Sequence, residues 1–216
     1  MSKKKLLIIL PAFNEENTIF RIVKKLKKYG IVLVIDDCSS DKTGKNALLA
    51  GARVINHKKN FGYETSINTG IKFFLKKNFE NLITIDADGQ HPTKYVSDIK
   101  KLLDKNYDVV CGVRSKIIRL SEKIFIFLSK IFLDLQDPLC GLKGYKRDFL
   151  KKYYTKKKSN LICTEYLLLA KKNKLRISEF KIKNKLRKDK SRFGSSLLTE
   201  IIILFTFLKI LLLLYI

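Results

Sequence analysis

Short apolar runs alternate with lysine-rich amphipathic stretches four times in the first half of this 216-residue chain. The apolar runs have the length of buried strands and lie at residues 6–10, 31–35, 53–56, 82–85 and 109–111. The stretches between them show helical periodicity, near residues 15–28, 42–50, 63–77 and 93–105. Strand–helix alternation of this kind predicts an α/β fold with a mainly parallel sheet flanked by helices.

The residues that follow the predicted strands carry the most informative side chains. In open α/β sheets, ligands bind beyond the carboxyl ends of the strands. Three strand ends are followed here by polar and largely acidic segments, at residues 11–16, 36–41 and 86–92. The sequence therefore predicts an acidic ligand site along one edge of the sheet.

Asp86 and Asp88 stand on either side of Ala87, directly after an apolar run. Because side chains alternate along an extended segment, the two carboxylates are expected to project to the same side. Hard oxygen ligands at this spacing, beside the flexible Gly89, suit Mg²⁺ or Mn²⁺, and Gln90 is a further oxygen donor. An isolated D-x-D is also common in surface turns, so the prediction of a metal site depends on the position of this motif at a strand end.

Two other segments are candidates for contacts with a nucleotide. Asp36 and Asp37 follow a strand, where carboxylates accept hydrogen bonds from ribose hydroxyls or a base N–H, although a capped turn is the alternative. Asn60 and Gly62 precede a predicted helix, whose N-terminal N–H groups and small glycine would let a ligand approach closely. By itself, this second segment is an ordinary turn.

The formal charge of +25 would favour nucleic acid, anionic lipid or a polyanionic substrate. The lysines are scattered over every helical segment, which indicates solvated helix faces rather than a dedicated groove. Acidic residues also gather where phosphates would have to bind, so no nucleic acid is expected as a partner. A basic nucleic-acid-binding α/β protein is kept as the alternative of a different class.

A second unit begins after Arg114, where apolar residues recur at helical spacing and predict an amphipathic helix over residues 117–135. Residues 197–216 are almost wholly apolar, and their length just suffices to cross a bilayer. Lys209 falls inside this run and would cost about 2.5–3.5 kcal/mol at the bilayer centre. A helix that spans the membrane and a shallow or re-entrant helix are therefore both possible interpretations. Contact with a membrane is favoured over docking of this helix on the domain.

Taken together, these segments resemble family 2 glycosyltransferases of the GT-A fold, and among them the dolichyl-phosphate and polyprenyl-phosphate sugar transferases. Residues 86–92 are the most specific match, because they are similar to the family's D-x-D-x-Q-H-P metal loop. Further segments resemble family motifs, at residues 36–43, 60–70, 112–114 and 137–145.

The resemblance implies a Rossmann-like GT-A domain at residues 1–194. Its nucleotide-sugar half would cover residues 1–114 and its acceptor half residues 115–194. A hydrophobic, membrane-associated helix would follow at residues 195–216. The sequence departs from the family in a short loop between residues 114 and 119, and in a tail at 187–194 that lacks the usual glycine after its first arginine.

The resemblance also implies roles for individual residues. Contacts with the nucleotide sugar are implied for Pro11, Phe13, Asn14, Glu15, Asp36, Asp37, Asn60, Gly62, Asp86, Ala87 and Asp88. Metal ligands would be Asp86, Asp88 and Gln90. Catalytic roles are assigned to Asp88, Arg114 and Glu165. Cations for an acceptor phosphate would be Arg114, Arg119, Arg187 and Arg192, since a guanidinium binds phosphate oxygens with a bidentate fork.

The implied reaction is an inverting, metal-dependent transfer from a UDP- or GDP-sugar, and the acceptor decides what else it needs. A polyprenyl or dolichyl phosphate arrives largely ionised and requires no general base. A glycan hydroxyl, as in cell-surface polysaccharide synthesis, requires a carboxylate to take its proton, and Glu165 is then the candidate. The amphipathic helix, the apolar tail and the basic surface favour the lipid phosphate, at the cytoplasmic face of a membrane.

Overall fold

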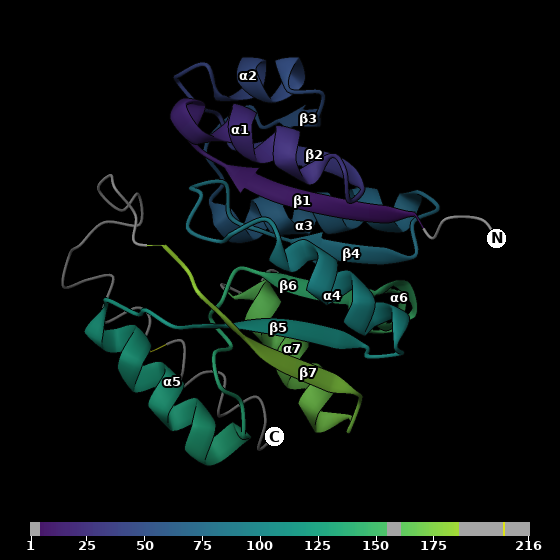
Figure 1. Cartoon of the computed structure of the whole chain (residues 1–216), viewed down its shortest axis with the longest axis vertical. Coiled ribbons are helices and arrows are strands. Elements are labelled where there is room, and N and C mark those ends of the chain that lie inside the picture. Colours follow the sequence, from purple (N-terminus) through teal and green to yellow (C-terminus); the bar gives the residue numbers. More distant parts are fainter. Residues whose placement is uncertain (1–4, 155–160, 186–204, 206–216) are drawn as a thin grey trace.

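The computed structural model describes residues 5–154, 161–185 and Phe205. A seven-stranded sheet with the order β3-β2-β1-β4-β6-β5-β7 runs through the molecule (Figure 1). Its strands are β1 Leu6–Ala12, β2 Ile31–Asp36, β3 Arg53–Asn56, β4 Asn81–Thr84, β5 Val109–Arg114, β6 Lys143–Lys146 and β7 Ile177–Ile182. All neighbours are parallel except β6, which is antiparallel to both β4 and β5. The prediction of an α/β fold with a mainly parallel sheet is confirmed.

Helices cover both faces of this sheet. They are α1 Glu16–Leu26, α2 Thr43–Leu49, α3 Tyr63–Lys76, α4 Tyr95–Asp104, α5 Leu120–Leu133, α6 Arg147–Tyr153 and α7 Ile162–Lys172. In Figure 1, α4 lies in front of the sheet, whereas α3 and α7 lie behind it. Strands covered on both faces require continuous apolar runs, and all seven residues of β1 are accordingly buried.

Two strands, β6 and β7, had no counterpart among the predicted elements. The sequence of β6 is Lys-Gly-Tyr-Lys, which does not look like a buried strand. Lys143 is nevertheless only 1% exposed, because its ammonium group donates hydrogen bonds to the carbonyl oxygens of Pro138 and Cys140. At Gly144 an added Cβ would lie 2.2 Å from Ile99 of α4, so the helix packs directly on the backbone of β6. Contacts distant in sequence, rather than local pattern, therefore create this strand.

Both halves of the chain contribute to one sheet, because β6 lies between β4 and β5. The division into a nucleotide half and an acceptor half at residue 114 stays a prediction. The helix expected over residues 117–135 is shorter than predicted, since α5 begins at Leu120 and ends at Leu133.

The expected C-terminal helix at residues 195–216 lies outside the described residues, apart from Phe205. Arg187 and Arg192 lie outside them as well. Within the part of the chain that the structure describes, no helix combines the length and the apolar character needed to cross a membrane.

Arg147 holds the C-terminal end of α3. Its guanidinium donates hydrogen bonds to four backbone carbonyl oxygens at 2.7–3.3 Å, those of Phe74, Leu75, Lys77 and Phe79. The last carbonyls of a helix have no donor within the helix itself. We expect Arg147→Ala to lower the free energy of unfolding by about 1.5–3 kcal/mol, measured by urea denaturation. The free energy of unfolding of Arg147→Lys should lie between those of wild type and Arg147→Ala. An alanine variant as stable as wild type would contradict this role of Arg147.

Candidate active site

The predicted acidic edge is formed at the carboxyl ends of three neighbouring strands, β2, β1 and β4 (Figure 1). Glu15, Asp36 and Asp37 are buried there, with exposed fractions of 4–7%. Asp86 and Asp88 are half-buried. The strand order thus collects carboxylates from distant parts of the sequence at one edge of the sheet.

The segment after β1 is joined to the segment after β2. Asn14 has a left-handed backbone with φ of 54°, which asparagine adopts more readily than most residues. Its N–H donates to Ser39 Oγ at 2.9 Å, and its Oδ1 accepts from the N–H of Ser40 at 2.8 Å. The N–H of Glu15 donates to Thr43 Oγ1 at 2.7 Å. These bonds fix the two loops as one wall of the site.

Other residues with predicted nucleotide contacts lie in the same wall. Pro11 is a buried residue of β1, and Phe13 is half-buried just beyond this strand. Asp36, at the end of β2, accepts a hydrogen bond from the N–H of Ser39 at 3.0 Å. Direct contact of these residues with a nucleotide stays a prediction.

Asp37 shapes the entrance to α3. Its Oδ1 lies 2.6 Å from His57 Nδ1 and accepts from the N–H of Phe61 at 3.0 Å, while its Oδ2 accepts from the N–H of Gly62 at 2.7 Å. Asn60 Oδ1 also accepts from the N–H of Gly62, at 3.1 Å. Gly62 has a φ of 87°, a conformation that glycine adopts without strain. Three contacts within the chain therefore engage the carboxylate of Asp37.

The D-x-D residues lie in the loop after β4, which ends at Thr84. Ala87 is 3% exposed, and its carbonyl oxygen accepts a hydrogen bond from Thr18 Oγ1 at 2.7 Å. Asp88 Oδ1 accepts from the N–H of Gln90 at 2.9 Å. The buried Ala87 anchors the loop and leaves the flanking carboxylates nearer the surface.

Asp86 is held from two sides. Tyr63 donates its hydroxyl hydrogen to Asp86 Oδ1 at 3.0 Å, and His91 Nε2 lies 3.0 Å from Oδ2. Burial acts to raise the pKa of Asp86, but His91, Tyr63 and the charge of Arg114 outweigh burial and hold the pKa below its usual value. The carboxylate is therefore ionised, as a metal ligand must be.

The residues of this loop fit a divalent cation, because carboxylate and amide oxygens are the ligands that Mg²⁺ and Mn²⁺ prefer. The loop offers two carboxylates and one amide, and no group of three or more His, Cys, Asp or Glu side chains among the described residues could hold an ion. A cation bound by Asp86, Asp88 and Gln90 would take further ligands from diphosphate oxygens, as Mg²⁺ commonly does.

Arg114, predicted to bind an acceptor phosphate, is engaged by two carboxylates. Its Nε and Nη2 donate to Asp137 at 2.8 and 3.0 Å, and its Nη1 donates to Glu122 at 3.0 Å. Burial acts to lower the pKa of Arg114, but the hydrogen bond and charge of Asp137 outweigh it and raise the pKa. Arg119 Nη1 lies 3.9 Å from Glu122. Both arginines thus meet the same glutamate on α5.

Glu165, the candidate base, lies in the first turn of α7, and its buried Oε2 has no hydrogen-bond partner among the described residues. Near it, Glu64 Oε2 accepts a hydrogen bond from the N–H of Ile162 at 2.6 Å. Burial raises the pKa of Glu64 to about 7, against the opposing effects of this hydrogen bond and of the Lys143 charge. The charge of Glu165 adds to the increase.

The raised pKa of Glu64 predicts a pH-dependent stability. Between pH 4.5 and about 7, the folded protein holds a proton on Glu64 that the unfolded chain has lost, so stability falls as pH rises through this window. We expect Glu64→Gln to match wild type near pH 4.5 and to be more stable than wild type at about pH 8. Urea denaturation across this range measures the difference, and a difference independent of pH would contradict the role of Glu64.

Several site residues received no role from the sequence. They are Tyr63, Glu64, His91, Asp137, Gly141 and Lys143. All lie within the segments that resemble family motifs, so those segments were the available signal. Which atoms they contact depends on tertiary structure.

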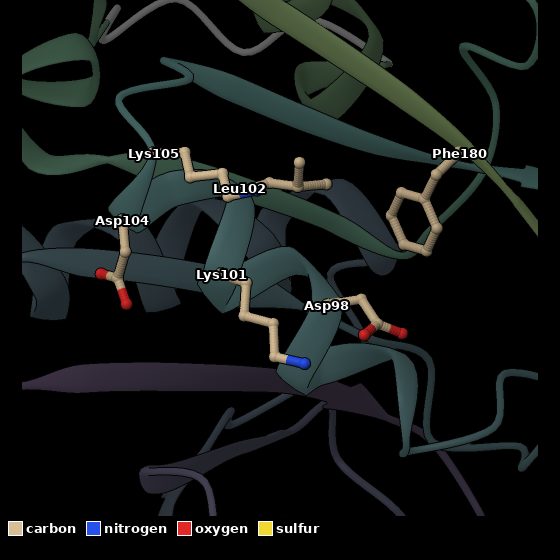
Figure 2. Close-up of a pocket in the computed structure, with 6 residues that line it drawn as sticks. All are labelled: Asp98, Lys101, Leu102, Asp104, Lys105 and Phe180. Carbon is tan, nitrogen blue, oxygen red and sulfur yellow. The ribbon is translucent and has the colours of Figure 1, made fainter.

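A cavity of about 440 Å³ lies away from this edge, between α4 and β7. Figure 2 shows the residues that line it, which are Asp98, Lys101, Leu102, Asp104, Lys105 and Phe180. They include no residue of the acidic edge. This cavity is therefore not the predicted nucleotide-sugar site.

A mixed α/β sheet with acidic loops at the carboxyl ends of β1, β2 and β4 is the arrangement of a glycosyltransferase with the GT-A fold. The chain belongs to glycosyl transferase family 2, whose sequence model matches residues 7–125. The chain is thus an enzyme that transfers a sugar.

Relatives with similar sequences include archaeal and bacterial proteins. An uncharacterised protein of Methanocaldococcus jannaschii is 33% identical, over 95% of this chain and 91% of its own length. The UDP-N-acetylglucosamine–dolichyl-phosphate N-acetylglucosaminyltransferase of Methanococcus voltae is 28% identical, over 85% of this chain and 86% of its own. An undecaprenyl-phosphate 4-deoxy-4-formamido-L-arabinose transferase of Photorhabdus laumondii is 30% identical, over 68% of this chain and 51% of its own.

Solved structures confirm the fold. The glucosyl-3-phosphoglycerate synthase of Mycobacterium tuberculosis, in complex with Mn²⁺, UDP and phosphoglyceric acid, has a TM-score of 0.76. The similarity covers 97% of this chain and 79% of that one, at 16% identity. At this identity the similarity is one of fold, and it bears on the GT-A assignment alone.

Proposed function

We propose that this glycosyltransferase moves a sugar from a UDP- or GDP-sugar to a polyprenyl or dolichyl phosphate. The transfer is inverting and depends on Mg²⁺ or Mn²⁺, and it takes place at the cytoplasmic face of a membrane. The observation that carries the proposal is the loop of Asp86 and Asp88 at the carboxyl end of β4. The relative from Methanococcus voltae, whose name specifies a dolichyl-phosphate acceptor, supports the choice of acceptor.

In this proposal Asp86, Asp88 and Gln90 hold the cation. A bound cation supplies positive charge that stabilises the departing diphosphate. Tyr63 and His91 fix the orientation of the Asp86 carboxylate through their contacts at 3.0 Å. The crystal structure of the Mycobacterium tuberculosis synthase with Mn²⁺ and UDP supports a metal–nucleotide site in a protein of this fold.

In this proposal the acceptor phosphate binds Arg114 and Arg119, and the charge of Arg114 also helps to hold the pKa of Asp86 low. A phosphate monoester is largely ionised at neutral pH and attacks without a general base. Arg114, at the end of β5, and Arg119, just before α5, both contact Glu122, so this place already holds an anion between two guanidinium groups. Arg187 and Arg192 belong to the proposal as further cations.

Helix α5 supports membrane contact. Its apolar side chains Leu120, Phe127 and Ile131 are 59–68% exposed and recur at helical spacing, so they form one apolar face. Lysines at positions 123 and 130 of the same helix provide positive charge near this face. A helix with an exposed apolar face and basic residues is typical of proteins that bind anionic membrane surfaces.

One observation favours a second candidate function, transfer to a glycan hydroxyl. Within the part of the chain that the structure describes, Glu165 has a buried Oε2 atom without a hydrogen-bond partner. A buried carboxylate oxygen that accepts no hydrogen bond from the described residues is available to accept a proton from a hydroxyl acceptor. If the acceptor is a glycan hydroxyl, Glu165→Gln should abolish sugar transfer. If the acceptor is a lipid phosphate, the same substitution should leave sugar transfer largely intact.

The proposal is tested by sugar transfer from radiolabelled UDP- and GDP-sugars, with polyprenyl phosphate in one series and a glycan acceptor in the other. We expect a lipid-linked product that requires Mn²⁺ or Mg²⁺. Asp88→Asn should reduce its rate by about 10³-fold, because the metal contributes several kcal/mol of charge stabilisation. Asp104→Asn, on the surface of α4, is the matched control and should retain activity. Product on the glycan alone would overturn the lipid acceptor.

A further inference from the structure

Four charged side chains meet between the end of β5 and the first turn of α5. Glu122 places one oxygen 3.0 Å from Arg114 Nη1 and its other oxygen 3.9 Å from Arg119 Nη1. Asp137 accepts hydrogen bonds from Nε and Nη2 of Arg114. Each arginine in this group therefore has at least one carboxylate within 4 Å.

The two carboxylates in this group are not equivalent. Asp137 is completely buried and also accepts the backbone N–H of Arg114 at 3.0 Å, so it is part of the frame that fixes this arginine. The side chain of Glu122 is 18% exposed and accepts one hydrogen bond from Arg114, that of Nη1. Glu122 thus occupies the outer side of the guanidinium, which is the side nearer to solvent.

The position of Glu122 is the one that suits an incoming anion. Carboxylate and phosphate oxygens bind guanidinium groups with the same kind of charge-assisted hydrogen bonds. A phosphate monoester carries a charge of about −1.5 to −2 at neutral pH. If it bound Arg114 and Arg119 with Glu122 still between them, the two anions would repel each other.

We propose that Glu122 is an internal competitor of the acceptor phosphate, which holds the anion position between Arg114 and Arg119 until the acceptor displaces it. This inference rests on the proposed lipid-phosphate acceptor. Glu122 therefore sets the affinity for the acceptor without taking part in the chemistry.

The test compares wild type with Glu122→Gln, which keeps the size of the side chain and an acceptor for Arg114 but removes the charge. We expect the KM for polyprenyl phosphate to fall about tenfold and the KM for the nucleotide sugar to stay unchanged, because only the acceptor competes with Glu122. Asp104→Asn removes a carboxylate from the Lys100 ion pair on α4 and should change neither constant. An unchanged or higher KM for polyprenyl phosphate in Glu122→Gln would overturn the inference.

A second measurement separates this inference from the proposed function. Inorganic phosphate is titrated into the full chain without donor, and it should bind Glu122→Gln more tightly than wild type, again by about tenfold. One outcome is that wild type forms a lipid-linked product while Glu122→Gln shows neither a lower KM for polyprenyl phosphate nor tighter phosphate binding. That result would refute the role of Glu122 and leave the proposed function standing. Tighter phosphate binding without any lipid-linked product would support the anion position and refute the lipid acceptor.

Discussion

Gly141→Ala is expected to reduce sugar transfer by roughly 10²-fold, because catalytic groups displaced by about an ångström lose rate on this scale. An added Cβ at Gly141 would lie 2.3 and 2.4 Å from the two carboxylate oxygens of Asp86. Asp86 cannot turn aside without giving up its contacts with Tyr63 and His91. The substitution therefore moves a proposed metal ligand although it adds only one methyl group.

The control for this prediction is Gly112→Ala. There the nearest atoms to an added Cβ are 3.2 and 3.3 Å away, on Ile182 and Cys140, and small shifts relieve such contacts. We expect the Gly112 variant to retain most of its activity. Metal titrations of both variants should show a higher Mn²⁺ requirement for Gly141→Ala alone. Equal activity of the Gly141 variant and wild type would show that the position of Asp86 is unimportant.

Asp137→Ala is expected to destabilise the fold by about 3–5 kcal/mol, because it removes the buried one of the two carboxylates that contact the Arg114 charge. The side chain of Asp137 is completely buried, and that of Arg114 is only 16% exposed. Three hydrogen bonds join the two residues, one of them from the backbone N–H of Arg114. The expected loss is a large part of the stability of a typical domain.

Urea denaturation measures this effect directly. Glu122→Gln removes the other carboxylate that contacts Arg114 but leaves a side-chain oxygen at a partly exposed position, so its cost should stay below about 1 kcal/mol. Asp137→Asn should fall between the two variants, because it retains hydrogen-bonding atoms and loses the charge. Similar stabilities for Asp137→Ala and Glu122→Gln would mean that the buried pair does not hold this part of the fold.

The first half of the fold was predictable because most of its strands are apolar runs, although β3 (Arg-Val-Ile-Asn) has only two apolar residues. Residues 31–35 and 53–56 were identified as strands and correspond to β2 and β3. The sheet edge that carries Asp86 followed from the same pattern, because β4 ends just before it. Strand β6 could not be predicted, since its Lys143 is buried through hydrogen bonds to carbonyl groups that only tertiary structure places nearby.

Contacts within the site were less predictable than the site's location. Arg114 was expected to face a phosphate, but its partners Asp137 and Glu122 lie 23 and 8 residues away in sequence. No local pattern identifies which of the chain's acidic residues would reach it. Glu64 was overlooked for a related reason, because its contact with Ile162 depends on the packing of α3 against α7.

The most direct test of the proposed site is calorimetric titration of UDP and GDP into the full chain, with and without Mn²⁺. We predict that one of the two nucleotides binds, that binding requires Mn²⁺, and that Asp88→Asn abolishes it while Glu122→Gln leaves it unchanged. Binding that is independent of both Mn²⁺ and Asp88 would contradict a metal–nucleotide site at the carboxyl end of β4.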